Sequence, residues 1–404
     1  MNKYQYISMQ EYCTNVTDGT HATPKEVQYG YPLVTSKNLN NGRLDLNNTY
    51  LISESDYNEI NTRSKVDKND VLISMIGTVG LVCFVDRQPD FAIKNVGLLK
   101  NKDEFHGKWL YYYLSSPEGQ YSIQERLRGT TQQYIPLNEI RKLPVKVLFS
   151  MDDMKKIVNF LSSLDDKIEL NTQINHNLEE QAKAIFKSWF VDFSALEDHE
   201  FYDNNGLCVP VGWDISCLSN VADYLNGLAM QKYRPDDGDD GYPVLKIKEL
   251  RQGMCDKESE RCSSFIKPEY IVHDGDVVFS WSGSLLVDFW CGGDCGLNQH
   301  LFKVTSTKFD KWFYYSWTLH HLNEFVAIAA DKATTMGHIK RENLQAAVVL
   351  IPPKNVYDEI GKLLGPIYES IVRNRVESKR LAQLRDALLP KLMSGEIDVS
   401  EVQV

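Results

Sequence analysis

The amino-acid sequence is duplicated internally. Tyr31–Leu39 returns as Tyr242–Leu250, an offset of 211 residues, and four further matches keep the same order at offsets between 203 and 211. These matches are Gly42 with Gly253, Asn69–Gly77 with Gly275–Gly283, Trp109–Tyr112 with Trp312–Tyr315, and Thr130–Ile135 with Thr334–Ile339. Self-similarity of this kind is the mark of repeated structural units, so a tandem duplication of a unit about half the chain long is predicted.

The first part of each copy has the pattern of short strands. Runs such as Asp70–Ser74 and Asp276–Phe279 are apolar and are bounded by Gly, Asn or Asp. The Trp-Tyr segments that follow them are more helical in pattern, and we interpret them as core rather than as base-stacking platforms. Each copy is therefore expected to form a compact mixed α/β domain.

The second part of each copy has the pattern of a long helix. Apolar residues of 152–190 alternate spacings of three and four, which is typical of a coiled-coil seam, and adding 203 to their numbers gives the same stripe near the C-terminus. Simple core packing would explain one such stripe, but two matched copies favour helices that pair with each other. The predicted fold class is α/β (α+β): two tandem mixed domains, each followed by a long helix, with the helices paired as an antiparallel coiled coil of pseudo-two-fold symmetry. The seam positions are Leu161, Leu164, Ile168, Asn171, Asn175, Leu178 and Ile185 in the first helix, and Leu364, Ile367, Ile371, Asn374, Ser378, Leu381 and Leu388 in the second.

The two helices differ in their content of helix breakers. Residues 152–190 contain neither Pro nor Gly, so they predict one helix of nearly 60 Å at about 1.5 Å per residue. Gly365-Pro366 and Pro390 interrupt the second copy, and we expect kinks or breaks there that leave about 35 Å uninterrupted. Asn171 and Asn175 match Asn374 and Ser378, and a buried polar layer of this kind commonly fixes register.

Composition indicates a soluble two-domain protein. The length suits two domains, no stretch of about 18 apolar residues could span a bilayer, and the N-terminus has no apolar signal region, so we expect a cytosolic chain with reduced thiols. The net charge of −11 argues against indiscriminate nucleic-acid binding. The acidity is unequal, because residues 1–150 carry 17 basic and 16 acidic side chains whereas residues 200–350 carry 14 and 21.

Metal sites and catalytic motifs are not expected. Cys255, Cys262, Cys291 and Cys295 lack the paired spacing of a structural zinc site, and the acidic run 235–241 lacks the spacing of a calcium loop. The sequence contains no nucleotide-binding glycine loop of the Walker type and no Asn-Pro-Pro-Tyr/Phe methyltransfer motif, and the scattered histidines have no ligand spacing. No catalysis by this chain alone is predicted.

The arrangement resembles a known family. A domain, a long helix that includes Leu161–Asn171, a second domain and a helix that ends in Leu388–Ile397 together resemble the specificity subunit of type I restriction-modification systems. The resemblance covers essentially the whole chain, and the two helical segments carry most of it. It implies a first target-recognition domain at 1–150, a spacer helix at 151–195, a second target-recognition domain at 196–350, and a second spacer helix with the C-terminal tail at 351–404.

The resemblance also implies partners. In this family each recognition domain reads one half of a bipartite, asymmetric double-stranded DNA target, and the paired helices set the spacer and dock two modification (methyltransferase) subunits. Restriction (endonuclease) subunits join the complex in the prokaryotic cytoplasm. S-adenosylmethionine, ATP and Mg are expected on those partners, with no cofactor in this chain.

Candidate DNA contacts are amide, hydroxyl and basic side chains in loops, because base edges present donors and acceptors and phosphates attract Lys and Arg. In the first domain these are Lys37, Asn38, Arg126, Arg128, Thr130, Thr131, Gln132 and Gln133. In the second they are Lys246, Lys248, Asn298, Gln299, His300, Thr334, Thr335, His338, Lys340 and Arg341. A threonine pair can equally cap a helix, and an exposed lysine is common on any surface.

The alternative from another functional class is a coiled-coil scaffold whose duplicated domains bind protein or glycan. The acidic net charge favours it. Copurification with a methyltransferase subunit and protection of an interrupted DNA sequence would separate the two hypotheses.

Overall fold

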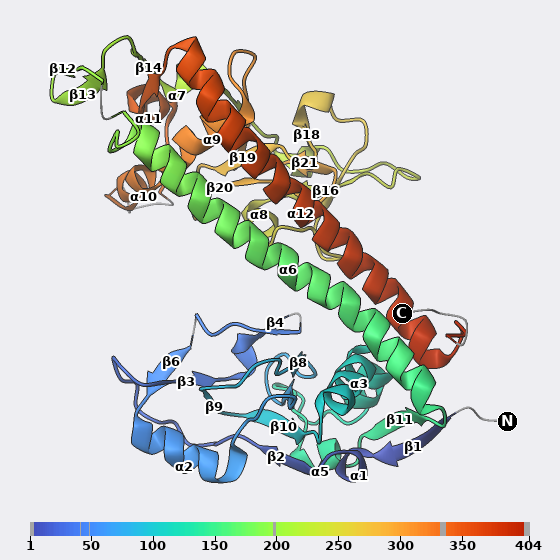
Figure 1. Cartoon of the computed structure of the whole chain (residues 1–404). Helices are drawn as coiled ribbons and strands as arrows, with labels where there is room; N and C mark the ends of the chain where they lie inside the picture. The colour runs from blue at the N-terminus through green and yellow to red at the C-terminus, as the bar shows by residue number, and fades with distance from the viewer. Residues whose placement is uncertain (1–3, 41, 48, 197–198, 332–336, 400–404) are drawn as a thin grey trace. The chain divides into compact units, whose positions relative to one another are not determined.

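The computed structural model describes residues 4–40, 42–47, 49–196, 199–331 and 337–399. It divides into two compact units, one formed by residues 1–166 with 382–404 and the other by residues 167–381. Two long helices, α6 (Met151–Phe190) and α12 (Lys354–Ser394), contribute to both units. Each unit is described below by itself (Figure 1).

The first unit is built on a four-stranded antiparallel sheet in the order β2-β10-β7-β8. A smaller sheet, β6-β3-β9, contains a parallel pair, and β1 pairs with β11. The elements of this unit before the long helices are β1 (Tyr4–Ser8), α1 (Met9–Tyr12), β2 (Asn15–Asp18), β3 (Tyr31–Val34), η1 (Ser36–Asn38), β4 (Leu39–Asn40), β5 (Arg43–Leu44), β6 (Tyr50–Ile52), α2 (Glu54–Ser64), β7 (Val71–Ser74), β8 (Val82–Phe84), β9 (Ala92–Ile93), β10 (Val96–Lys100), α3 (Glu104–Ser115), α4 (Pro117–Gln124), α5 (Leu137–Arg141) and β11 (Pro144–Leu148).

The second unit repeats this plan. Its main sheet has the order β15-β22-β19-β20, its smaller sheet β17-β16-β21-β18 again contains one parallel pair, and β14 pairs with β23. Its elements apart from the long helices are β12 (Phe201–Asn204), β13 (Leu207–Pro210), β14 (Asp214–Cys217), α7 (Leu218–Val221), β15 (Asp223–Asn226), η2 (Met230–Lys232), β16 (Tyr242–Leu245), α8 (Ile247–Gln252), β17 (Arg261–Cys262), η3 (Pro268–Tyr270), β18 (Ile271–Val272), β19 (Val277–Ser280), β20 (Leu286–Phe289), β21 (Cys295–Leu297), β22 (Leu301–Thr305), α9 (Lys311–His320), α10 (Leu322–Asp331), α11 (Arg341–Ala346) and β23 (Val348–Ile351).

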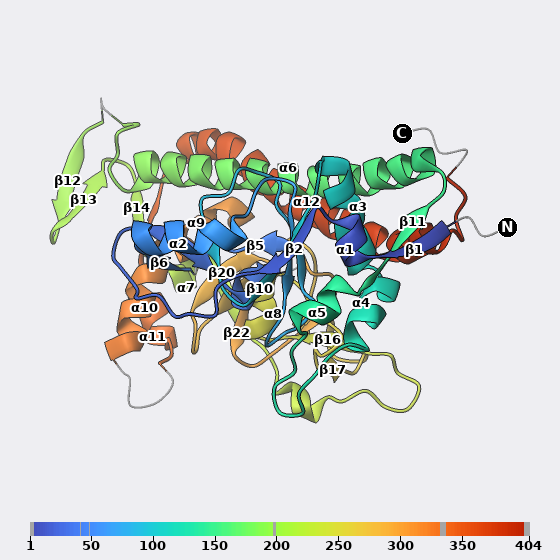
Figure 2. The same ribbon diagram turned by 90° about the horizontal axis from the view of Figure 1, so that it is seen from below.

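The duplication extends to the register of the strands. Val71 of β7 lies opposite Leu99 of β10, and the equivalent Val277 of β19 lies opposite Val304 of β22. The hairpin β12–β13 is an addition to the second unit, and it projects from the C-terminal end of α6 in both ribbon views (Figures 1 and 2). The predicted fold class of two tandem mixed α/β domains, each followed by a long helix, is confirmed.

The Trp-Tyr segments belong to the core, as their pattern indicated. Trp109 of α3 is completely buried against Met154 and Ile157 of α6 in the first unit. Trp312 of α9 is buried in the second unit within a cluster that includes Phe190 of α6 and Tyr357 of α12. Each domain is therefore anchored to the helix pair through aromatic side chains, which bury large apolar areas.

The long helices pair in antiparallel orientation within each unit. In the second unit, Asn171 of α6 contacts Asn374 and Ser378 of α12, whereas Asn175, one turn further along α6, contacts Ile371 and Asn374. In the first unit, Asp165 of α6 accepts a hydrogen bond from Arg385 of α12 at 2.6 Å. The predicted antiparallel pairing is confirmed.

The polar layer of the second unit obeys the two-fold relation of the repeat. Asn171 donates to the Ser378 hydroxyl at 3.2 Å, and Asn374 donates to the Asn175 amide oxygen at 2.9 Å. Adding 203 to the first donor and subtracting it from the first acceptor gives the second pair, so the two bonds are equivalent in the duplicated sequence. The pseudo-two-fold relation of the two helices is visible in these contacts.

The prediction that the prolines of α12 leave only about 35 Å of uninterrupted helix is wrong. It runs unbroken over 41 residues, against 40 in α6, so each is about 60 Å long. The Pro366 ring lies on an exposed face of the helix, and the residue before it is Gly365, whose missing Cβ relieves the usual clash with a proline ring. Packing of the apolar face against α6 and the second domain outweighs the lost backbone hydrogen bond.

Pro366→Ala should stabilise the protein. Proline in a helix interior is about 3 kcal/mol less favourable than alanine, and its restriction of the unfolded chain returns about 0.4–1 kcal/mol of this. We expect the unfolding free energy to rise by about 2–2.6 kcal/mol and the thermal midpoint by about 4–10 °C, measured by calorimetry on the full chain. Glu369→Ala, an exposed position one turn later, is the control and should change little; a lower midpoint for Pro366→Ala would contradict the account of a strained but continuous helix.

Candidate nucleic-acid interface

One end of the main sheet of the second unit is formed by the ends of three strands, β15, β19 and β22. Ser280, the last residue of β19, lies opposite Leu301, the first of β22, and Asn226, the last of β15, lies opposite Phe302. Antiparallel pairing thus brings the residues after β19, those before β22 and those at the end of β15 to the same end of the sheet. We call this end of the sheet the reading end of the unit.

Aromatic and amide side chains gather at this reading end. The Trp281 indole donates to the Asn226 amide oxygen at 2.9 Å, and its ring centroid lies 5.9 Å from that of His300 and 6.3 Å from that of His338. His300 Nδ1 is 3.1 Å from the Ser282 hydroxyl. The structure therefore brings the predicted residues His300 and His338 together, and it adds Trp281, which sequence reasoning had used only as a marker of the repeat.

Two other predicted residues of this region differ in accessibility. Gln299 is half-buried, and its amide nitrogen lies 3.4 Å from His300 Nε2. Asn298 is buried, and its side-chain oxygen accepts a hydrogen bond from the His300 backbone amide at 3.3 Å. Gln299 is available to a ligand, whereas Asn298 shapes the turn before β22.

The first unit presents a tight exposed loop at the corresponding place. Arg128 and Tyr134 exchange two backbone hydrogen bonds of 2.8 and 2.9 Å, which close the loop, and Ile76 after β7 forms a bridge with Tyr134. The same bridge joins Ser282 with His338 in the second unit. The predicted residues Thr130, Thr131, Gln132 and Gln133 all lie exposed on this loop, and none of their side chains hydrogen bonds to any residue that the structure describes.

Gly129 makes this loop possible. Its φ is 87°, and a Cβ there would lie 2.3 Å from the Gln132 carbonyl oxygen. Only glycine combines this left-handed conformation with so close a backbone approach.

The remaining candidates of the second loop are partly described. Thr334 and Thr335 lie outside the described residues. Lys340 and Arg341 are exposed where α11 begins, and the Lys340 backbone amide donates to the Asn343 side chain at 2.9 Å. Both basic side chains are placed to reach a ligand near His338.

Asn38 has a structural role. It is buried, its side-chain oxygen accepts from the backbone and hydroxyl of Thr35 at 2.8 and 2.9 Å, and its nitrogen donates to the Asp45 carbonyl at 3.2 Å. It orders the turn that carries the exposed Lys37. Both polar atoms of the Asn38 side chain, a candidate DNA contact, therefore form hydrogen bonds within the protein.

The two lysines of the second domain that were predicted to bind phosphate are ion-paired. Lys246 Nζ lies 2.6 Å from Glu260, and Lys248 Nζ lies 3.0 Å from Asp256. Glu249, next to Lys248, is buried and accepts from the Lys246 backbone amide, so α8 starts from a fixed position. In this state both lysine charges are offset by acids of the adjacent loop.

The two predicted arginines also have protein partners. Arg126 donates to the Ser122 carbonyl at 2.8 Å, and Arg128, which is more exposed, lies 3.8 Å from Glu139. An exposed ion pair of that length contributes little free energy, so the Arg128 side chain can exchange it for a phosphate at small cost.

The seam positions are distributed between the two units. Leu161 and Leu164 are buried in the first unit, and Leu388 packs on the same cluster. In the second unit Asn171, Asn175, Leu364 and Ile371 are buried, whereas Ile168, Leu178, Ile185, Ile367, Asn374, Ser378 and Leu381 are half-buried.

The described part of the chain contains no group of three or more His, Cys, Asp or Glu side chains that could hold a metal ion. All eight cysteines are free thiols, with Cys255 and Cys295 Sγ 3.4 Å apart. In the acidic run, hydrogen bonds from Ser264, Ser263 and Gly241 lower the pKa of Asp239 to about 2. Those hydrogen bonds hold the acidic run in a loop.

None of the helices in the described ranges combines the length and the apolar character of a membrane span.

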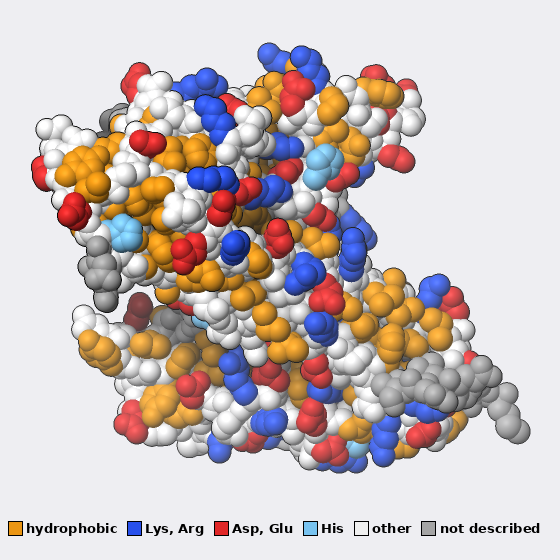
Figure 3. Space-filling model, turned by 45° about the horizontal axis from the view of Figure 1, so that its top comes forward, with side chains coloured by type: hydrophobic (Ala, Val, Ile, Leu, Met, Phe, Trp, Pro, Cys, Tyr) orange, Lys and Arg blue, Asp and Glu red, His pale blue; other side chains and the backbone are white. Residues whose placement is uncertain are grey.

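Charges of both signs are interspersed on the surface. On the face shown in Figure 3, Lys and Arg side chains alternate with Asp and Glu. With a net charge of −11, electrostatic attraction for phosphate requires local cations, such as the exposed Lys37, Arg128, Lys340 and Arg341.

Two copies of one mixed α/β domain, each followed by one of two paired long helices, define the class of the protein as a duplicated two-domain subunit built on a helix pair. The family model "Type I restriction modification DNA specificity domain" matches the chain twice, at residues 6–180 and 210–384. The chain therefore belongs to the family of type I restriction-modification specificity subunits, the subunits that carry DNA specificity rather than catalysis.

Known relatives have the same description. The MjaIX specificity subunit of Methanocaldococcus jannaschii is 24% identical over 344 residues, covering 83% of this chain and 79% of that protein. The HindI specificity subunit of Haemophilus influenzae is 24% identical over 425 residues, covering 87% and 92%. The crystal structure of the S subunit from M. genitalium shares the fold, with a TM-score of 0.56 at 15% identity over 96% of both chains.

Gly129→Ala should damage recognition by the first domain. The substitution places a side chain at positive φ and against the Gln132 carbonyl, which costs about 1–3 kcal/mol if the loop is to keep its shape. We expect DNA binding by the assembled complex to weaken about tenfold, measured by titration on its mapped target. Gly206→Ala in the hairpin is the matched control, because φ there is also 87° but the space is open; equal losses for both variants would count against a role of the loop.

Releasing the paired lysines should strengthen non-specific binding. In Glu260→Gln with Asp256→Asn, Lys246 and Lys248 lose their carboxylate partners and become available to phosphates. We expect tighter binding of a random duplex at low salt and a log–log salt slope steeper by up to about 1.8, since each added phosphate contact contributes about 0.9. Anisotropy titrations at several salt concentrations measure this, with Glu180→Gln on α6 as control; an unchanged slope would show that these lysines face away from DNA.

Proposed function

We propose that each unit reads one half of a bipartite, asymmetric DNA target through its reading end. The supporting observation is that one scaffold occurs twice in the chain with different side chains at the same place. Trp281 and His338 of the second unit correspond to Met75 and Tyr134 of the first, since Ile339 donates to the Trp281 carbonyl and Ile135 to the Met75 carbonyl at the same 2.9 Å. A repeated scaffold with unlike readers suits a target whose halves differ.

The chemistry of the exposed groups supports base reading. Gln132 and Gln133 in the first unit and Gln299 in the second offer the paired donor and acceptor that match adenine in the major groove. Lys37, Arg126 and Arg128 in the first domain, and Lys246, Lys248, Lys340 and Arg341 in the second, are the proposed phosphate contacts. Thr130, Thr131, His300 and His338 are proposed to contact bases, together with Thr334 and Thr335.

We propose that the helix pair acts as the ruler between the half-sites. Half-site spacing follows protein geometry wherever two readers are held rigidly, and two helices of 40 and 41 residues with a polar layer at their contact are suited to this role. In this proposal the recognition domains span 1–150 and 196–350, with the spacer helices at 151–195 and 351–404.

We propose that the helices also dock two modification subunits, and that restriction subunits join the complex. S-adenosylmethionine, ATP and Mg would then be bound by those partners, and the complex would act on DNA in the cytoplasm of a prokaryotic cell. The proposal rests on membership of the family and on the lack of a nucleotide-binding or methyltransfer motif in this sequence.

A domain exchange tests the two-reader proposal. Residues 196–350 are replaced by the second recognition domain of another family member, the chimera is expressed with its modification subunit, and methylated sites are mapped by sequencing host DNA. We expect the half of the target read by the first domain to be unchanged and the other half to be replaced. Unaltered motifs, or a change in both halves, would contradict the proposal; a wild-type complex that methylates no interrupted sequence would contradict it at the first step.

A further inference from the structure

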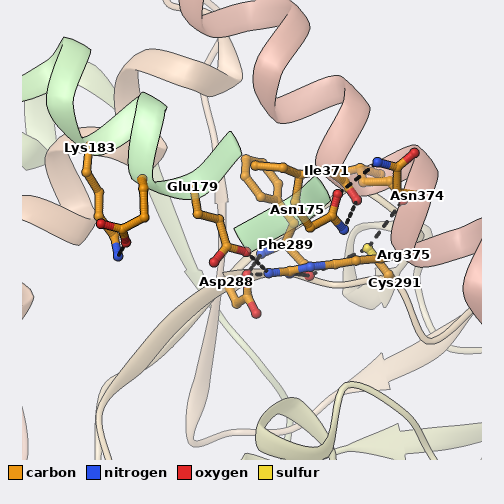
Figure 4. A network of polar contacts seen from close by, with 11 residues as sticks. Asn175, Glu179, Lys183, Asp288, Phe289, Cys291, Ile371, Asn374 and Arg375 are labelled. Atoms are coloured by element: carbon orange, nitrogen blue, oxygen red, sulfur yellow. Dashed lines mark hydrogen bonds and ion pairs between the residues drawn. The ribbon is translucent and has the colours of Figure 1, made fainter. Parts of the chain in front are cut away.

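An arginine of α12 joins three elements of the second unit. Arg375 donates through Nη2 to Glu179 of α6 at 2.8 Å and through Nη1 to Asp288 of β20 at 2.7 Å (Figure 4). The Nη1 atom also lies 3.5 Å from the Phe289 carbonyl oxygen. One guanidinium therefore connects both spacer helices with the edge strand of the main sheet.

Guanidinium geometry gives this contact a defined direction. A planar fork with fixed N–H directions restricts the relative orientation of its two carboxylate partners, which a lysine ammonium would not. The side chain is 29% exposed, and its partners Asp288 and Glu179 are 29% and 37% exposed, so solvent screens the pairs only in part.

Apolar contacts hold the same domain on α12. Phe289 packs on Tyr315 and Tyr368 with ring centroids 4.1 and 5.5 Å apart, which anchors the domain on α12. Apolar contact depends on buried area and is not directional, so it holds a domain on a helix without fixing its angle tightly.

Directional contacts with α12 also come from Tyr368, whose hydroxyl lies 2.9 Å from that of Ser316, and from Tyr357, whose hydroxyl accepts from the Asp310 backbone amide at 2.8 Å. Of these three side chains of α12, Arg375 is the one that also bonds to α6.

This contact is not a product of the duplication. The position of α6 equivalent to Arg375 is Thr172, 203 residues earlier, and it is exposed. The first unit has its own arginine, Arg385, which lies 2.6 Å from Asp165; that carboxylate also accepts from Tyr112 of α3 at 2.7 Å. In each unit one arginine of α12 thus bonds to an acid of α6: Arg375 to Glu179 and Arg385 to Asp165.

We propose that Arg375 is a positioning residue that fixes the angle of the second recognition domain on the helix pair and so restricts the complex to one spacer length. The proposal rests on the proposed two-reader function. Adding one base pair to the spacer moves a half-site by about 3.4 Å and rotates it by about 35°, so a domain held at one angle accepts one spacer. Without the arginine, the aromatic contacts and the hydrogen bonds to α12 remain, but the bonds that tie β20 to α6 through one guanidinium are lost, and the domain can then tilt relative to α6 to meet a displaced half-site.

The test uses the full chain in complex with its modification subunit. The wild-type target is mapped first, and a plasmid library then carries its two half-sites separated by the native spacer and by spacers one and two base pairs shorter or longer. Methylation of each member is counted by sequencing for wild type, Arg375→Met, Arg375→Lys and Asp288→Asn. Lys183→Met is the control, because Lys183 also forms an ion pair, 2.8 Å from Glu180, but on α6 alone (Figure 4).

We expect Arg375→Met to methylate sites whose spacer differs by one base pair at rates within about tenfold of the native spacer, with the bases of both halves unchanged. Asp288→Asn should methylate sites with an altered spacer less than Arg375→Met does. Arg375→Lys should methylate them less than Asp288→Asn but more than wild type, and Lys183→Met should match wild type. If Arg375→Met methylates only sites with the native spacer, whether quickly or slowly, the positioning role is overturned. Loss of stability alone would lower methylation of every spacer equally.

Two outcomes keep this inference separate from the proposed function. If wild type methylates a bipartite target and the variants keep its single spacer, the positioning role fails and the two-reader function stands. If Arg375→Met does not assemble, Asp288→Asn decides the question, since it keeps the shape of the side chain and leaves the pair with Glu179 intact.

Discussion

Antiparallel pairing of α6 and α12 is the constraint on which both units depend. Each helix has an apolar stripe that it cannot bury alone, and the equivalent bonds Asn171–Ser378 and Asn374–Asn175 form in one register. Sliding α12 by a heptad would bring Asn171 and Asn175 opposite Leu364, Ile367 and Ile371, where their amides would lack partners at a cost of about 1–3 kcal/mol each. The polar layer therefore selects the register that the apolar stripe alone leaves open.

The two units share a backbone scaffold but differ in the side chains at their reading ends. Strand order and register in the main sheet are the same in both units, and the bridge Ile76–Tyr134 of the first corresponds to Ser282–His338 of the second. Side chains at the reading ends differ: exposed amides and hydroxyls on a glycine-closed loop in the first, an indole between two imidazoles in the second. Since the backbone that holds these groups is constant, a change of target requires only changes at the strand ends and loops.

Sequence reasoning reached the features that periodicity encodes. The duplication, the seam and the α/β class follow from patterns that repeat along the chain. The continuous α12 was missed because the proline rule is local, while the packing that preserves this helix comes from the rest of the fold. Trp281 was overlooked, and the burial of Asn38 was not anticipated, because the surroundings of a loop residue depend on partners that are distant in the sequence. Arg375 lies outside the seam, and its partners are 87 and 196 residues away, so no local pattern indicates it.

The charge of the chain bears on how DNA is held. The net charge is −11, and Lys246 and Lys248 are paired to acids in this structure. Phosphate contacts supply most of the affinity of DNA-binding proteins, whereas base contacts supply selectivity. We infer a division of labour in which this chain discriminates between sequences, and the other subunits of the proposed complex add phosphate contacts to those proposed for this chain. That division also explains why rigidity matters in this chain: a reader that binds weakly on its own contributes to specificity only if its angle and spacing are already correct when the DNA arrives.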